Sequence, residues 1–137
     1  MIEPRWLSKN GLLILHEDSI REHGGSRGMR DEGLLESALA RPHNILLYSA
    51  SVSLAQLAAA YAFGIAKNHP FVDGNKRAAF AAMNIFLEKN GFYLVATEVD
   101  ATLTMLQLAA GAIDEDVLAA WIECNIESGI PGRRIPG

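Results

Sequence analysis

The sequence predicts an all-α protein, a compact bundle of about six helices with a short flap or hairpin beside one of its loops. Apolar residues recur at three- and four-residue steps through most of the 137 positions. Capping residues precede these periodic segments, and glycine or proline follows them. Only one brief stretch, "FYLV", is predicted to be extended.

The first half of the chain is predicted to hold two helices and a glycine-rich connection. Ser8 can cap a first helix that ends at Gly24-Gly25. Residues 24–33 lie in a stretch rich in glycine with no apolar period, so they predict a loop or short hairpin. Asp31 can cap a second helix, which we expect to end at Pro42 because proline disrupts a helix interior. Residues 42–52 give no clear signal.

The remaining helices have clearer boundaries. Ser53 and Gln56 form a capping box for a third helix that ends before Pro70. A fourth helix is expected from Asn75 to Asn90-Gly91. After "FYLV", Thr97 caps a fifth helix that ends at Gly111. Asp114 caps a sixth, which places Trp121 and Ile122 on its buried face, and the tail "GIPGRRIPG" has no period.

The composition limits the class of protein. Half of the residues are apolar and one fifth are charged, as in ordinary globular chains. We expect one domain, residues 1–137, with 131–137 a flexible tail. A net charge of −4 argues against a generic nucleic-acid binder. The lone Cys124 and the absence of a long apolar N-terminal run suit a cytoplasmic protein that binds no membrane.

The stretch "NHPFVDGNKRAAF", residues 68–80, gathers five polar groups between two helices. Gly74 and Asn75 fall at the start of the fourth helix, where free N–H groups and the helix dipole favour a phosphate. Lys76 and Arg77 add two cations there, at a cost of about 0.3–1 kcal/mol each when exposed. A bound anion would offset that cost.

Two further groups in this stretch suit proton and metal chemistry. The imidazole of His69 can accept a hydroxyl proton, as a general base does. Asp73 offers oxygen ligands for Mg²⁺, which accompanies bound nucleotides. Each residue alone also suits a plain turn, a helix cap or a solvated surface charge. Together they favour phosphoryl or nucleotidyl transfer to a hydroxyl.

The segment "HPFVDGNKR" closely resembles the signature of the Fic/Doc proteins, a His-x-Phe-x-Asp/Asn-x-Asn-Gly/Lys-Arg loop between two helices. Two flanking segments, "HEDSIREHGGSRGMRDEGLLESALARP" and "FLEKNGFYLVATEVDATLTMLQLAAGAIDEDVLAAWI", resemble the two halves of death-on-curing (Doc) toxins. The resemblance covers roughly residues 7–126. It implies the Fic fold, a compact bundle of about six helices with a flap near the active-site loop.

The resemblance also assigns roles. It implies that His69 activates the target hydroxyl and that Asp73 binds Mg²⁺ or orients the acceptor. Phe71 would anchor the loop in the core, and residues 24–33 would form a flap that aligns a target segment. The implied phosphate site consists of Gly74, Asn75 and Lys76, with Arg77 on the terminal phosphates.

The residue at position 76 distinguishes the two reactions of the family, AMP transfer and phosphoryl transfer. Many Fic proteins carry Gly at this place and transfer AMP from ATP to a protein hydroxyl, whereas Doc proteins carry Lys and act as kinases. The Doc-like flanks favour a kinase that uses Mg²⁺ and ATP, and the resemblance implies a Thr/Ser hydroxyl of elongation factor Tu as its target. The alternative is a protein AMP transferase, since Pro70 and Gly74 match that pattern.

An antitoxin is implied by the same resemblance. Self-restrained Fic proteins carry a Ser/Thr-x-x-x-Glu-Gly/Asn segment that blocks the arginine. The only Glu followed by Gly or Asn is Glu32, and Gly28 lies four residues before it, so this segment is missing. We expect a Phd-like antitoxin whose partly disordered tail folds into a groove on the bundle.

Two other classes of function remain open from the residues. A metal-dependent phosphohydrolase would use His69 and Asp73 with His43 or His16 as further ligands. A non-catalytic binding module would keep the loop for structure alone.

Overall fold

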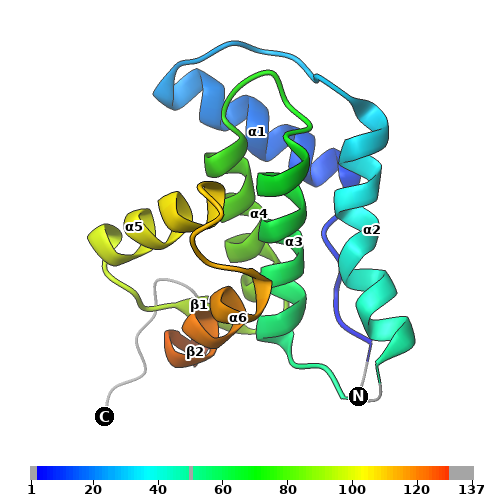
Figure 1. Ribbon diagram of the computed structural model, residues 1–137, viewed down its shortest axis with the longest axis vertical. Helices are drawn as coiled ribbons and strands as arrows, with labels where there is room; N and C mark the ends of the chain where they lie inside the picture. The colour runs from blue at the N-terminus through cyan, green and yellow to red at the C-terminus, as the bar shows by residue number, and fades with distance from the viewer. Residues whose placement is uncertain (1–2, 50, 130–137) are drawn as a thin grey trace.

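The computed structural model describes residues 3–49 and 51–129, and within them the chain forms six helices and two short strands (Figure 1). This confirms the mainly α-helical bundle; the expected tail at 131–137 lies outside the described residues. The elements in chain order are α1 Lys9–His23, α2 Glu32–Tyr48, α3 Leu54–Asn68, α4 Asn75–Lys89, β1 Phe92–Leu94, α5 Glu98–Ala109, α6 Glu115–Cys124 and β2 Ile126–Ser128.

Helix α3 forms the centre of the bundle, with α2, α4 and α6 packed around it (Figure 1). It is buried on almost every side because its sequence, "LAQLAAAYAFGIAKN", consists mainly of alanine and other apolar residues. Small side chains let the neighbouring helices approach closely: a Cβ on Gly64 would lie 3.2 Å from the Cα of Ala38 on α2. Tyr61 and Phe86 are among the largest side chains that fill the core around α3.

The predicted helix starts are confirmed. At every start except that of α4, the side-chain oxygen of the capping residue accepts a hydrogen bond from a main-chain N–H in the first turn. The capping box of α3 is complete, since Gln56 also accepts from the main-chain N–H of Ser53 at 2.7 Å. The confirmed caps are Ser8, Asp31, Ser53, Thr97 and Asp114.

The predicted end of the second helix is wrong. Helix α2 continues through Pro42 to Tyr48. An interior proline costs about 3 kcal/mol through its lost N–H and its clash with the preceding turn. Pro42 is itself fully buried, and Ile45 and Leu46 beyond it pack on the core. Because complete burial of one apolar side chain contributes about 1.5–3 kcal/mol, these contacts together offset the cost of the proline.

The extended stretch "FYLV" has a partner that the sequence did not reveal. β1 pairs antiparallel with β2, with Phe92 opposite Ser128 and Leu94 opposite Ile126. β2 was missed because its sequence, "IES", has a single apolar residue and lacks the aromatic and apolar run that marks β1. No helix within the described residues has the length and the apolar character needed to cross a bilayer.

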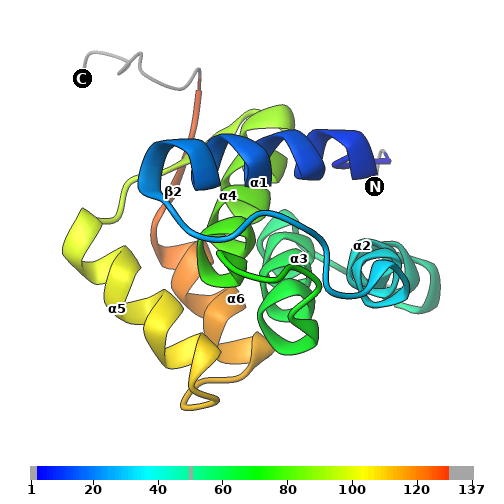
Figure 2. The ribbon, with the colours of Figure 1, turned by 90° about the horizontal axis from the view of Figure 1, so that it is seen from above.

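Helix α1 and the segment after it position the functional loop. α1 packs on α4 at the end of the bundle where the loop between α3 and α4 turns. The segment that follows α1 passes across this loop before α2 begins (Figures 1 and 2). Residues far apart in the sequence therefore meet at one end of the molecule.

Candidate active site

The loop between α3 and α4 begins at His69, which ends α3 in an unusual backbone conformation. His69 is the C-cap of α3 with φ 49° and ψ 57°, and its N–H donates to Ile65 O at 3.1 Å. Among the described residues it is the only non-glycine residue with a positive φ. Pro70 was expected to end the helix and does so, although the residue before it is left-handed rather than extended.

The side chain of Asn75 closes this loop. Its Oδ1 accepts from Phe71 N at 3.0 Å, and its Nδ2 donates to Phe71 O at 2.9 Å. Asn75 is only 8% exposed, so both bonds are shielded from water. Its Nδ2 lies 3.5 Å from His69 Nδ1, too far to fix the tautomer of that ring. Asn75 therefore holds the loop with its side chain, and only its main-chain N–H remains for a phosphate.

His16 on α1 supports the loop from the opposite side. Its ring stacks on Phe71 with 3.7 Å between the ring centroids and 6° between the planes. Its Nε2 lies 2.7 Å from the main-chain oxygen of Asp73. A carbonyl oxygen can only accept, so His16 Nε2 carries the proton. Phe71 is 1% exposed and anchors the loop in the core, as expected.

The glycine-rich segment docks on this loop as a flap, defined here as residues 24–31. It forms a loop rather than a hairpin, because its only bridge is an isolated antiparallel pair between Met29 and Phe71. Val72 N donates to Gly28 O at 3.1 Å, and Arg30 N donates to Pro70 O at 2.7 Å. The flap thus lies beside the His69 loop, where the resemblance had implied it.

Asp73 connects the flap to the start of α4. Its carboxylate accepts from Ser26 N at 3.1 Å and from Gly74 N at 2.8 Å. These two main-chain donors, with a smaller contribution from the nearby Arg77 charge, lower the pKa of Asp73 below its ordinary value. Asp73 is therefore ionised at neutral pH. A carboxylate has about four acceptor positions, so two remain for a cation.

The start of α4 has the features of an anion site. Gly74 is the N-cap with φ 76°, and no side chain caps the helix. The first main-chain N–H groups of a helix have no partner within it, so they can donate to a bound anion. Lys76 is exposed, and within the described residues its Nζ has no hydrogen-bond or ion-pair partner.

Arg77 does have a partner in the protein. Its Nη2 donates to Gly24 O at 2.9 Å, at the carboxyl end of α1. A cation is favourable at that end of a helix. The contact with Gly24 O thus partly compensates the cost of placing the Arg77 cation at the start of α4. The argument for a bound anion therefore depends mainly on Lys76.

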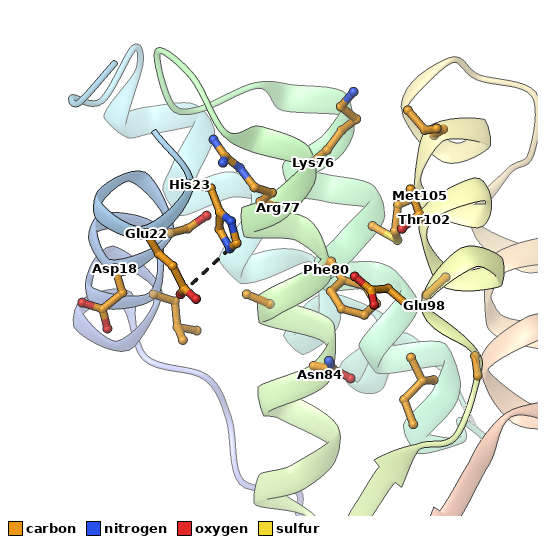
Figure 3. Close-up of a pocket in the computed structure, with 17 residues that line it drawn as sticks. Asp18, Glu22, His23, Lys76, Arg77, Phe80, Asn84, Glu98, Thr102 and Met105 are labelled. Atoms are coloured by element: carbon orange, nitrogen blue, oxygen red, sulfur yellow. Dashed lines mark ion pairs between the residues drawn. The ribbon is translucent and has the colours of Figure 1, made fainter. Parts of the chain in front are cut away.

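A groove lies next to the loop, between α1, α4 and α5, with a volume of about 740 Å³. Lys76 and Arg77 line one end of it, Phe80 and Asn84 line the wall further along α4, and Met105 faces α4 from α5 (Figure 3). His69 and Asp73 are not among its lining residues. We call this the α1/α4/α5 groove. It can hold a ligand beside the candidate active site without covering His69.

The structure brings together all of the predicted site residues, which span one loop and the first turn of α4: His69, Asp73, Gly74, Asn75, Lys76 and Arg77. It does not assemble the metal site of a phosphohydrolase. His43 stacks on Trp6 with 3.8 Å between the centroids, and His16 donates to the loop. No group of three or more His, Cys, Asp or Glu suited to a metal occurs in the part of the chain that is described.

From the sequence, His16 was considered only as a further metal ligand of a phosphohydrolase. No separate role was predicted for Arg30, which contacts the main chain at His69. Leu12, His16 and Ile20 are spaced by four, which places His16 on the buried face of α1. A buried histidine requires a hydrogen-bond partner, and this was the available signal. For Arg30 there was none, because its partner lies 39 residues away in the sequence.

Comparison with known proteins defines the class to which this site belongs. Residues 6–87 match the Fic/DOC family, and the chain belongs to that family. It is 33% identical over 101 residues to "Protein kinase doc" of Escherichia phage P1, covering 74% of this chain and 80% of that protein. It is 43% identical over 100 residues to "Toxin Doc" of Mycolicibacterium smegmatis, covering 71% and 77% respectively.

The contact between the flap and Asp73 can be tested at Gly25. This residue has φ +117°, and a Cβ there would lie 2.7 Å from Asp73 Oδ2. We expect Gly25→Ala to release the flap and to speed trypsin cleavage after Arg27 and Arg30 by about tenfold or more, since such strain shifts the local opening equilibrium.

Gly24→Ala is the matched control. Gly24 also has a positive φ, +82°, but a Cβ there meets nothing within 4 Å. This variant carries backbone strain without the clash, so it should speed cleavage less. Equal acceleration in the two variants would mean that the contact with Asp73 does not hold the flap.

Proposed function

We propose that this protein is the toxin of a toxin–antitoxin pair and acts as an ATP-dependent protein kinase on a Thr or Ser hydroxyl. The observation that carries the proposal is the preformed loop that joins His69 to the start of α4 with Lys76 at its opening. The kinship with proteins named "Protein kinase doc" and "Toxin Doc" supports it. Residues 1–137 would act as one Fic/Doc domain.

His69 is the general base in this proposal. It is exposed at the end of α3 and its backbone is fixed by the loop, so a substrate hydroxyl can reach its ring. The hydroxyl oxygen attacks the γ-phosphorus of ATP, and the bond from that phosphorus to the bridging oxygen breaks. ADP leaves with the electron pair, and the hydroxyl proton passes to the imidazole of His69.

The start of α4 holds the phosphates. Main-chain N–H groups of the first turn, the Lys76 ammonium and the Arg77 guanidinium stabilise the charge on the phosphate oxygens. Asp73 would hold Mg²⁺, which in proteins is bound through one or two carboxylates together with substrate phosphates. Bound Mg²⁺ neutralises phosphate charge. The ionised carboxylate with two free acceptor positions suits that ion.

Transfer of AMP is the alternative reaction. It places the α-phosphorus, rather than the γ-phosphorus, opposite the hydroxyl, with the same base. Lys76 favours the kinase because its side chain adds charge and occupies space at the opening of the anion site. A reversed placement of the nucleotide is the physical consequence that we infer.

The flap would align the protein substrate beside His69. Its main chain already forms a bridge with the loop at Met29, so an extended segment of a target could add to it by backbone hydrogen bonds. Elongation factor Tu is the target that we propose, with translation arrested as a result. Such a target places the protein in the cytoplasm.

Isotope transfer from ATP tests the reaction directly. ATP labelled at either the α- or the γ-phosphate is incubated with Mg²⁺, purified elongation factor Tu and the protein. We expect label to move from the γ position only, to fall by about 100-fold or more in His69→Ala, and to vanish when EDTA removes Mg²⁺. His43→Ala is the matched control, because His43 stacks on Trp6 away from the loop.

The other outcomes each have a meaning. Label from the α position would replace the kinase by the AMP transferase. Label that persists in His69→Ala would remove His69 from its role. If neither label moves to this protein or to any other in a cell lysate, the enzyme proposal fails and a non-catalytic binding module takes its place.

We further propose a Phd-like antitoxin whose partly disordered tail folds as a helix into the α1/α4/α5 groove. Apolar side chains of α1, α4 and α5, such as Leu15, Phe80 and Leu106, alternate in the groove with polar ones, and Lys76 and Arg77 lie at one end. Because Asp18, Glu22 and Glu98 also line the groove, it suits an amphipathic segment whose acidic residues face the end with the two cations. There its occupant would cover both cations.

Leu106 and Leu103 on α5 offer a matched pair to test this. Leu106 is 44% exposed and lines the groove, whereas Leu103 is 53% exposed and lies outside it. We expect Leu106→Asp to weaken binding of the protein encoded beside this one by about tenfold or more in titration calorimetry, and Leu103→Asp to leave it unchanged. Equal affinities for both variants would exclude the groove.

A further inference from the structure

His69 has a conformation that requires support. A left-handed backbone is disfavoured for a residue with a Cβ, and a single such residue persists only where its surroundings hold it. His69 is the only described non-glycine residue in this region, with φ 49° and ψ 57°. The conformation sets the direction in which the side chain leaves the chain. Whatever holds this backbone therefore also orients the imidazole.

Arg30 of the flap contacts the main chain at this point. Its side-chain Nε donates to His69 O at 2.7 Å, and its Nη2 donates to Asn68 O at 2.7 Å. Its main-chain N–H donates to Pro70 O at 2.7 Å. Three successive carbonyl oxygens around the base are thus bound by one residue.

The chemistry of this contact is specific to arginine. The planar guanidinium presents its N–H groups as a rigid fork, so two of them reach neighbouring oxygens at the same time. The oxygens lie at the carboxyl end of α3, where partial negative charge gathers and a cation is favourable. A lysine keeps the charge but lacks the fork. A glutamine keeps neither the charge nor the second donor nitrogen.

We propose that Arg30 is a positioning residue for His69: from the flap it fixes the backbone of the base, so that the base is in place only while the flap is docked. This inference rests on the proposed role of His69. Arg30 is itself exposed, and it acts through main-chain oxygens rather than through the imidazole. The flap that aligns the substrate would then also hold His69 in the position in which it can act as the base.

The first test reads the backbone of His69 without any enzyme assay. The ¹³Cα and ¹³Cβ shifts of His69 are measured by NMR in the wild type and in Arg30→Ala. We expect the wild-type shifts to indicate the left-handed conformation and those of Arg30→Ala to move away from it. Arg30→Lys should give an intermediate shift.

The second test measures transfer of label from ATP with the same variants. Misplacement of a catalytic group by about 1 Å costs on the order of 100-fold, so we expect kcat in Arg30→Ala to fall about 10- to 100-fold. KM for ATP should stay within about threefold, because the phosphate site at α4 is unaffected. Guanidinium ion added at millimolar concentration should restore part of the rate to Arg30→Ala and none to the wild type.

Arg41→Ala is the matched control. Arg41 also uses Nε and Nη2 to bind two oxygens at a helix end, those of Glu115 on α6, at 3.0 and 2.7 Å. Its loss should lower the melting temperature but leave the His69 shifts and kcat unchanged. A general loss of stability would affect both arginine variants alike.

The outcomes separate this inference from the proposed function. Unchanged His69 shifts in Arg30→Ala would overturn the positioning role, whatever the enzyme does. Shifts that move while kcat stays the same would show that the backbone is held but that the base does not depend on it, which also overturns the proposal. If His69 shifts move as expected and no label is transferred even by the wild type, the kinase proposal has failed and the structural part of the inference stands.

Discussion

The candidate active site depends on two hydrogen bonds between the side chain of Asn75 and the main chain of Phe71. They close the loop after α3 onto the start of α4, so that the residue ending one helix and the residues starting the next keep a fixed relation. Both bonds are buried. An unsatisfied buried donor or acceptor costs about 1–3 kcal/mol, so these bonds break only when the loop opens far enough for water to replace both of them. This closure fixes the residues from Phe71 to Asn75 relative to the free N–H groups of α4, and it brings His69 to the same end of the helix.

The support around the loop has an inner part and an outer part. On the inner side His16 stacks on Phe71 and donates to Asp73 O, and α3 and α4 pack tightly below. On the outer side the flap is exposed and is held mainly by hydrogen bonds to the loop. Segments with few buried apolar contacts open first, so the flap is expected to open while the bonds between Asn75 and Phe71 stay formed. Only the backbone at His69, which Arg30 binds from the flap, then depends on the docked flap. This division suits a kinase in which the phosphate site is permanent and the substrate platform is adjustable.

Much of this arrangement could be predicted from local sequence. The capping box of Ser53 and Gln56 and the run from His69 to Arg77 carry their signals within a few residues. The start of α3 was therefore predicted correctly, and the predicted site residues lie on one loop and the first turn of α4. The errors arose where contacts between residues far apart in the sequence determine the secondary structure. Pro42 stays helical because it is buried against the core, and Ile126 forms a strand only because β1 lies beside it. His16 and Arg30 bind residues that lie 57 and 39 positions away, and no local sequence pattern predicts contacts over such separations.

The central claim is that the loop from His69 to Asn75 is preformed, and the exchange rate of one amide tests it most directly. The N–H of Phe71 donates to Asn75 Oδ1 and belongs to a residue that is 1% exposed. In native-state hydrogen exchange of the free protein, the account predicts that this amide exchanges within about tenfold of the slowest amides of α3 and α4. Exchange of Phe71 as fast as that of the flap amides would contradict it, because the loop would then open on its own and the site would form only when a ligand binds.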